Sequence, residues 1–208
     1  MSEKKEITTI LLAGGQSKRM GKDKAFLKLN GKTFFRIIIE KISKYSNQII
    51  ISTNKDKNLY LPDISDLTIH PLFVKDKNPY SGPLNGIISC IPYVKNKFIF
   101  IATCDTPLLN PDLIPFLSDK INNYDAVIPV INEKKQFLNT IYTKNALNIA
   151  NNLYSAGKRS LYAWTNLLNV KEIHQKELEA VKNSLLSYWS INTPEDYTRL
   201  LDIWHKYY

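Results

Sequence analysis

The chain has 208 residues, with 28 Lys and Arg against 19 Asp and Glu, a formal net charge of +9 and 44% hydrophobic residues. A chain of this length buries roughly 70% of its unfolded surface, which excludes the disordered and fibrous classes and predicts one globular domain over residues 1–208. The two cysteines, Cys90 and Cys104, provide neither a disulfide framework nor a paired zinc-ligand spacing. We expect both to be small core residues in a reducing cytosol.

The basic charge is spread along the whole chain and forms no stripe, so it does not favour a nucleic-acid partner. It is compatible with small polyanionic ligands. The first apolar run ends at Gly14 and is far shorter than the ~18 apolar residues that a membrane span requires. We therefore expect a cytoplasmic protein with no membrane partner and no targeting segment.

Apolar periodicity predicts alternating strands and helices along the chain. The strands are expected at 7–13, 48–52, 67–73, 97–103, 125–131 and 137–143, and the helices at 34–45, 83–94, 110–121, 144–154, 160–168 and from 193 onward. Alternation of this kind predicts an α/β fold with a doubly wound, mostly parallel sheet. No repeat or linker divides the chain.

A glycine-rich segment with cations follows the first expected strand. Its glycines are Gly14, Gly15 and Gly21, and its cations include Arg19 and Lys24. Glycines let backbone N–H groups point at phosphate oxygens, and the cations add formal charge. The spacing fits neither a P-loop nor the dinucleotide fingerprint. The segment therefore predicts a different phosphate-binding loop, with a glycine turn carrying solvated charges as the alternative.

Asp105 follows the expected strand 97–103 directly. Ligands of open α/β sheets bind outside the carboxyl ends of the strands, and Mg²⁺ is held by one or two carboxylates together with substrate phosphates. The position suits a Mg²⁺ ligand. Taken alone, an Asp before Thr106-Pro107 is more often a turn or capping residue than a metal ligand.

The segment Leu12-Ala13-Gly14-Gly15-Gln16-Ser17-Lys18-Arg19-Met20-Gly21-Lys22-Asp23-Lys24 resembles the signature of MobA-type molybdenum cofactor guanylyltransferases, within the glycosyltransferase-A-like nucleotidyltransferases. The resemblance continues through residues 81–86 (Ser-Gly-Pro-Leu-Asn-Gly), 104–107 (Cys-Asp-Thr-Pro) and 191–195 (Ile-Asn-Thr-Pro-Glu), and so covers nearly the whole chain. It implies a Rossmann-like single domain of the nucleotide-diphospho-sugar transferase type. Residues 1–110 would then form a nucleotide-binding half and residues 111–208 an acceptor half.

The activity that the resemblance implies is transfer of GMP from GTP to molybdenum-molybdopterin, with release of pyrophosphate. Asp105 would bind Mg²⁺ and nucleotide, and Arg19, Lys24 and Asp105 would form the catalytic set. Nucleotide-binding positions by this resemblance are Leu12, Ala13, Gly14, Gly15, Lys24, Asn54, Asp76 and Asp105, and Asn192 would approach the pterin. Protein partners would be other cofactor-biosynthesis proteins or apo-molybdoenzymes.

Several of these residues have structural alternatives. Lys24 could be a surface lysine at a helix start, Asp76 an exposed loop charge, and Asn192 a turn residue before a capped helix. The alignment of Asn54 against Ser52 is open.

The chain departs from the family pattern at Phe137-Leu138-Asn139-Thr140 and at Ser190, both on the expected pterin side. Rival functions are transfer of CMP to molybdopterin, transfer to a sugar phosphate, or a non-catalytic nucleotide or cofactor carrier.

Overall fold

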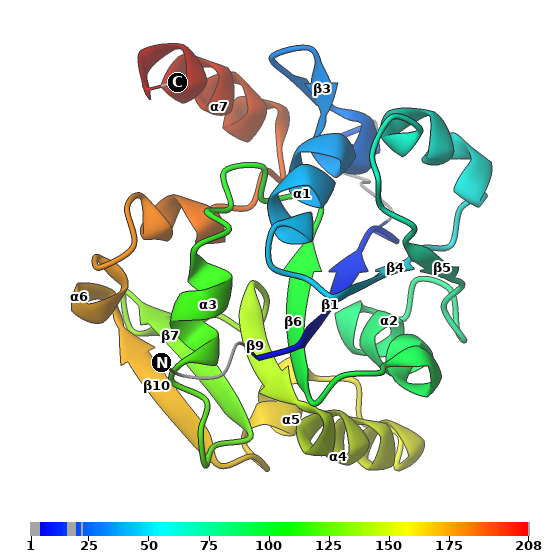
Figure 1. Cartoon of the computed structure of the whole chain (residues 1–208), viewed down its shortest axis with the longest axis vertical. Helices are drawn as coiled ribbons and strands as arrows, with labels where there is room; N and C mark the ends of the chain where they lie inside the picture. Colours follow the sequence, from blue (N-terminus) through cyan, green and yellow to red (C-terminus); the bar gives the residue numbers. More distant parts are fainter. Residues whose placement is uncertain (1–4, 16–19, 22, 208) are drawn as a thin grey trace.

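The computed structural model describes residues 5–15, 20–21 and 23–207. In these residues the chain forms one central sheet with helices on both faces (Figure 1). The main strand order is β10 (Val170–His174), β7 (Ala126–Ile131), β9 (Thr140–Thr143), β6 (Phe98–Thr103), β1 (Ile7–Leu12), β4 (Gln48–Ser52) and β5 (Leu72–Val74). All of these run parallel except β9. The predicted α/β fold with a mostly parallel sheet is confirmed.

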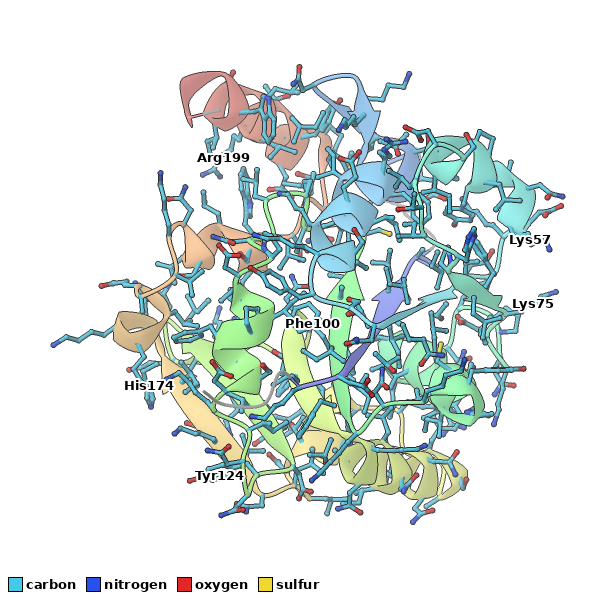
Figure 2. The ribbon with its side chains drawn as sticks, viewed as in Figure 1. Lys57, Lys75, Phe100, Tyr124, His174 and Arg199 are labelled. Carbon is cyan, nitrogen blue, oxygen red and sulfur yellow. The ribbon has the colours of Figure 1, made fainter. Side chains whose placement is uncertain are left out.

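Successive side chains along each strand point to opposite faces of the sheet, so a hydrophobic layer forms on each face. On β6, Phe100 faces one layer, which also receives α1 (Phe34–Ser43), α3 (Leu113–Ser118) and α6 (Gln175–Leu178). Ile99 and Ile101 face the other, which receives α2 (Pro83–Cys90), α4 (Lys144–Ser155) and α5 (Leu161–Thr165). Figure 2 shows Phe100 in the interior, with the other labelled side chains at the periphery: Lys57, Lys75, Tyr124, His174 and Arg199. Strands buried on both faces explain the long apolar runs in the sequence.

The C-terminal helix α7 (Pro194–Tyr207) packs outside the two layers. It lies near α1 and the hairpin of β2 (Lys28–Leu29) and β3 (Lys32–Thr33) in Figure 1. A third cluster, with Leu29, Phe34 and Leu200 buried in it, joins these elements. This packing brings the segment before α7 to the carboxyl end of the sheet. Among the described helices, none is both long and apolar enough to cross a membrane.

β9 runs antiparallel because the chain turns back directly after β7. Asn132 and Glu133 have φ values of 47° and 63°, the left-handed pair that a tight hairpin requires, and β8 (Lys134–Lys135) pairs back onto β7. So short a connection leaves no room for the crossover that a parallel strand needs.

Several predicted boundaries were wrong. The strand expected at 67–73 begins at Leu72, and the strand expected at 137–143 begins at Thr140, after Asn139 with φ 54°. The helix expected at 83–94 ends as an α-helix at Cys90, and a 3-10 turn containing Pro92 continues it. The helix expected at 110–121 is confined to α3. The hairpin β2–β3, β8, β10 and α6 were not predicted from the sequence.

Candidate active site

Four neighbouring parallel strands end at the same edge of the sheet. β1 leads into Gly14, β4 into Asn54, β5 toward Asp76 and β6 into Asp105. The chain moves outward from β1 to β4 and β5, and then returns to the other side of β1 to form β6. This reversal is a topological switch point, where open α/β sheets form their ligand crevice.

A cavity of about 400 Å³ lies at this edge. Strand ends, the loop before α2 and the start of α2 provide its lining, which consists of Leu12, Gly14, Gly15, Ser52, Asp76, Tyr80, Gly82, Pro83, Gly86, Thr103, Asp105 and Leu138. Its size is typical of a small-molecule site. Two of its glycines are tightly packed: a Cβ on Gly14 would lie 3.3 Å from both Asn54 Nδ2 and Asp76 Oδ2, and a Cβ on Gly86 would lie 2.6 Å from Ser52 Oγ.

Asp76 is held by two neutral donors. Ser52 Oγ donates to Asp76 Oδ1 at 2.5 Å, and Asn54 Nδ2 donates to Asp76 Oδ2 at 2.9 Å. The residue is only 9% exposed. The alternative of an exposed loop charge is therefore wrong. Ser52 and Asn54, the two residues between which the family alignment is open, both hold this carboxylate.

Asp105 is surrounded by segments far apart in the sequence. Lys24 Nζ lies 3.4 Å from Asp105 Oδ2 and donates to Asn192 Oδ1 at 2.5 Å. Thr103 Oγ1 donates to Asp105 Oδ1 at 2.9 Å, and the N–H of Ile191 donates to the Asp105 carbonyl at 2.8 Å. The Lys24 and Asp105 side chains are only 17% and 22% exposed. The glycine-rich loop and the segment before α7 thus meet at Asp105.

The segment before α7 is itself fixed by the helix cap. The backbone N–H groups of Asn192 and Thr193 donate to Asp196 Oδ2 at 2.9 and 3.0 Å, and Thr193 Oγ1 accepts from the Asp196 N–H. These hydrogen bonds lower the pKa of the Asp196 carboxyl. The cap orients Asn192 toward Lys24, so Asn192 does more than occupy a turn.

The sequence-predicted site residues that the structure describes divide into three groups. Leu12, Gly14, Gly15, Asp76 and Asp105 line the cavity, and Lys24 and Asn192 lie beside it around Asp105. Ala13 and Asn54 lie behind the lining: the Ala13 carbonyl accepts from Tyr60 Oη at 3.2 Å, and Asn54 supports Asp76. Arg19 lies outside the described residues.

Thr103 and Gly86 also line the cavity but were not predicted as functional positions, and Ser52 was considered only as an alternative to Asn54. Gly86 carries a signal that could have been used. A glycine inside a helix costs about 1 kcal/mol relative to Ala, so its presence there indicates close packing. Ser52 and Thr103 carry no comparable signal, because a hydroxyl at a strand end is common.

The cysteine beside Asp105 is not a nucleophile. Burial raises the pKa of the Cys104 thiol well above its ordinary value, and the neighbouring Asp105 charge acts in the same direction. Cys90 is buried as well, and burial likewise raises its pKa. Both residues are core cysteines, as predicted, and both thiols are protonated at neutral pH.

The carboxylate of Asp105 at the cavity suits a hard cation that takes few ligands from the protein. The described residues contain no group of three or more His, Cys, Asp or Glu side chains that could enclose a metal ion. Mg²⁺ needs only one or two carboxylates when substrate phosphates and water complete its shell. Asp105, partly exposed at the cavity, fits that requirement.

Comparisons with known proteins agree with this arrangement. The model of the MobA-like NTP transferase domain matches residues 9–173. A probable molybdenum cofactor guanylyltransferase from Clostridium perfringens (strain SM101) is 32% identical over 202 residues, covering 92% of this chain and 94% of that protein. The molybdenum cofactor guanylyltransferase of Desulfosudis oleivorans is 29% identical over 192 residues, covering 91% and 92%.

Among solved structures, molybdopterin-guanine dinucleotide biosynthesis protein A from Archaeoglobus fulgidus has a TM-score of 0.79 at 23% identity, covering 96% of this chain and 99% of that one. This likeness supports the fold. The family model, which matches residues 9–173, and the relatives, one of which covers 92% of the chain, show the family as well as the fold. The chain belongs to the MobA-like NTP transferase family and is a nucleotidyltransferase enzyme.

Proposed function

We propose that the enzyme transfers GMP from GTP to molybdenum-molybdopterin, forming the guanine dinucleotide cofactor and releasing pyrophosphate. The observation that carries this is the meeting of Lys24 and Asn192 at Asp105, which lines a cavity together with Gly14 and Gly15. The names of the full-length relatives support the choice of nucleotide and acceptor.

The cavity would receive GTP. The backbone from Leu12 to Gly15 would seat the nucleotide, and Asp76 would contact its guanine half. Asp76 is suited to a fixed contact because Ser52 and Asn54 already orient both of its carboxylate oxygens. Lys24, and Arg19 by its place in the same loop, would neutralise the triphosphate.

Nucleotidyl transfer requires little covalent help from the protein. A phosphate oxygen of the acceptor attacks the α-phosphorus of GTP, a new P–O bond forms, and the bond to the pyrophosphate oxygen breaks. Positioning and charge neutralisation therefore supply most of the catalysis. Lys24 would move from Asp105 to the phosphates, which its long, flexible side chain permits.

Asp105 would hold Mg²⁺, which when bound supplies positive charge to the triphosphate and the leaving pyrophosphate. Thr103 would fix the rotamer of Asp105 through its hydrogen bond to Oδ1. Asn192 would hold Lys24 in place until the nucleotide arrives.

The chain as a whole fits this assignment. Residues 1–110 would form the nucleotide half and residues 111–208 the acceptor half, and the net charge of +9 suits polyanionic substrates and product. The buried, protonated thiols of Cys90 and Cys104 are compatible with a cytoplasmic location. Protein partners would be other cofactor-biosynthesis proteins or apo-molybdoenzymes that receive the product.

Pyrophosphate release tests the proposal. Purified protein with Mg²⁺ is given GTP or CTP, each with and without molybdate-loaded molybdopterin. Release that requires GTP and the pterin together is expected. A preference for CTP would keep the mechanism but change the product. Tight GTP binding with no release would instead support the carrier function.

A further inference from the structure

A group of buried polar side chains lies between α2 and α4, which cover the same face of the sheet (Figure 1). Asn85 and Ser89 of α2 are 0% and 3% exposed, and Tyr154 of α4 is 7% exposed. Burying polar groups this deeply costs free energy unless they have hydrogen-bond partners. Their partners lie in the loop between β5 and α2, which includes Asn78. We call the side chains of Asn78, Asn85, Ser89 and Tyr154 the anchoring network.

Asn85 binds both main-chain groups of one loop residue. Its Nδ2 donates to the Asn78 carbonyl at 2.7 Å, and its Oδ1 accepts from the Asn78 N–H at 3.3 Å. Tyr154 Oη donates to the same Oδ1 at 3.0 Å and accepts from Asn78 Nδ2 at 3.1 Å. The reversed Asn85 amide would present its NH2 group to the Asn78 N–H, which is also a donor. The donors and acceptors therefore specify one position of Asn78 relative to α2 and α4.

Ser89 holds the preceding residue of the loop. Its Oγ accepts from the Lys77 N–H at 2.9 Å and donates to the Asn85 carbonyl at 2.7 Å. Lys77 directly follows Asp76, whose carboxylate is held by side chains at the end of β4. Residues 76–78 are thus fixed from two sides, to the end of β4 through this carboxylate and to α2 and α4 through the anchoring network.

The turn 78–82 forms one wall of the nucleotide cavity, the cavity of about 400 Å³ at the carboxyl edge of the sheet. Tyr80 lines the cavity and is half exposed. Its φ of 62° is unfavourable for an aromatic residue and persists only where the surrounding structure holds it. The Ser81 N–H donates at 3.2 Å to the Asn78 carbonyl, the same oxygen that accepts from the anchoring network. The network therefore holds this unfavourable turn at its first residue.

We propose that Asn85 and Tyr154 are positioning residues for the nucleotide, because the anchoring network holds the turn 78–82 in the conformation that walls the cavity. Neither residue lines the cavity, so both act through the turn. Without the network the turn would populate other conformations, and the apparent Kd would rise as the fraction of binding-competent protein falls. Asp105 and Lys24 lie outside the network, so the transfer rate at saturating nucleotide would not change. The inference rests on the proposed function only in taking GTP as the ligand of this cavity.

Tyr154→Phe tests the role of the hydroxyl. It keeps the ring, whose centroid lies 3.6 Å from the Arg159 guanidinium carbon, and removes the donor to Asn85 Oδ1. We expect the Kd for GTP with Mg²⁺, measured by calorimetry without acceptor, to rise about fivefold or more, which corresponds to the loss of a hydrogen bond worth about 1 kcal/mol. The rate of GMP transfer at saturating GTP should stay within about twofold of the wild-type rate. In Asn85→Ala, which already lacks the amide, adding Tyr154→Phe should raise the Kd by less than about twofold.

Thr8→Val is the matched control, because it also removes one buried hydroxyl. Thr8 is 0% exposed, and its Oγ1 donates to Gln48 Oε1 at 2.8 Å. It lies near the start of β1, at the opposite edge of the sheet from the cavity. The variant should lose unfolding free energy, as Tyr154→Phe does, and leave the Kd for GTP unchanged. An equal rise in Kd for both variants would show that lost stability weakens binding, and would overturn the inference.

Three further results would overturn it: an unchanged GTP Kd in Tyr154→Phe, slower transfer at saturating GTP without a change in Kd, or independent effects of the two changes in the double variant. If the wild type bound CTP and not GTP, the proposed function would fail, whereas the same weakening of CTP binding by Tyr154→Phe would uphold the positioning role. Binding of neither nucleotide to the wild type would overturn both.

Discussion

Gly86 offers the sharpest test of how the nucleotide cavity is built. It lies inside α2, and a Cβ there would lie 2.6 Å from Ser52 Oγ, 3.0 Å from Leu12 Cδ2 and 3.5 Å from Asp76 Oδ1. Gly86→Ala must therefore displace Ser52 Oγ, the donor to Asp76 Oδ1. Leu12 and Asp76 lie too close for the helix to absorb the methyl group freely.

The expected loss of stability follows from opposing contributions. Overpacking a tight core costs about 1–3 kcal/mol. Weakening a hydrogen bond to a buried carboxylate costs about 1.5–3 kcal/mol more. The gain in helix propensity from Gly to Ala offsets about 1 kcal/mol. We expect a net loss of about 1.5–5 kcal/mol in the free energy of unfolding, measured by urea denaturation, and a GTP Kd several-fold higher.

A control variant and a double variant test whether the clash with Ser52 causes the loss of stability in Gly86→Ala. A Cβ on Gly15 would meet nothing within 4 Å, so Gly15→Ala should leave the unfolding free energy within about 0.5 kcal/mol. Ser52→Ala removes the clashing oxygen, so the double variant Ser52→Ala with Gly86→Ala should lose at least about 1 kcal/mol less than the sum of the single losses. Additive losses, or a Gly86→Ala protein as stable as the wild type, would refute the packing described here.

Two more predictions concern groups behind the site. Lys41 Nζ donates to the Pro107 carbonyl at 2.7 Å, and burial lowers its pKa to about 8 from 10.5. Folding therefore disfavours the charged form of Lys41. The difference in unfolding free energy between the wild type and Lys41→Met, measured by paired urea titrations, should rise between about pH 8 and 10.5, by at most about 3 kcal/mol. A flat difference over that range would contradict the burial of this ammonium group. Tyr60→Phe keeps a ring that packs 4.8 Å from Phe35 but removes the hydroxyl that holds Ala13 and Thr53. It should cost about 1 kcal/mol and raise the GTP Kd a few-fold, and an unchanged Kd would show that this hydroxyl does not position the loop.

The interior strands were predictable because burial on both faces leaves an uninterrupted apolar signature. β1, β4, β6 and β7 all lie within their predicted ranges for this reason. β10 was missed because it is an edge strand in which Lys171 and Glu172 interrupt the apolar pattern. The hairpin β2–β3 could have been found, since Asn30-Gly31 is a strong signal for a two-residue turn and both residues have positive φ.

The site was predictable at its motifs but not at its contacts. Asp105 and the glycine loop each carry a local signature at a strand end, whereas Asp76 was assigned only through the family resemblance. The pairing of Lys24 with Asn192, 168 positions apart, arises only from the docking of α7. The support of Asp76 by Ser52 likewise depends on the adjacency of β4 and β5. Such contacts follow from tertiary packing, which local sequence patterns do not encode.

The role of Asp105 is tested most directly by single-turnover GMP transfer, followed as pyrophosphate release with Mg²⁺, GTP and molybdate-loaded molybdopterin. Asp105→Ala should lose several hundredfold or more in rate, about 3 kcal/mol or more in the barrier, because it removes the carboxylate that would hold the metal at the triphosphate. Asp112→Ala removes a carboxylate with a half-exposed side chain far from the cavity and should transfer at the wild-type rate. A near-normal rate for Asp105→Ala would contradict the assignment of this edge of the sheet as the catalytic centre.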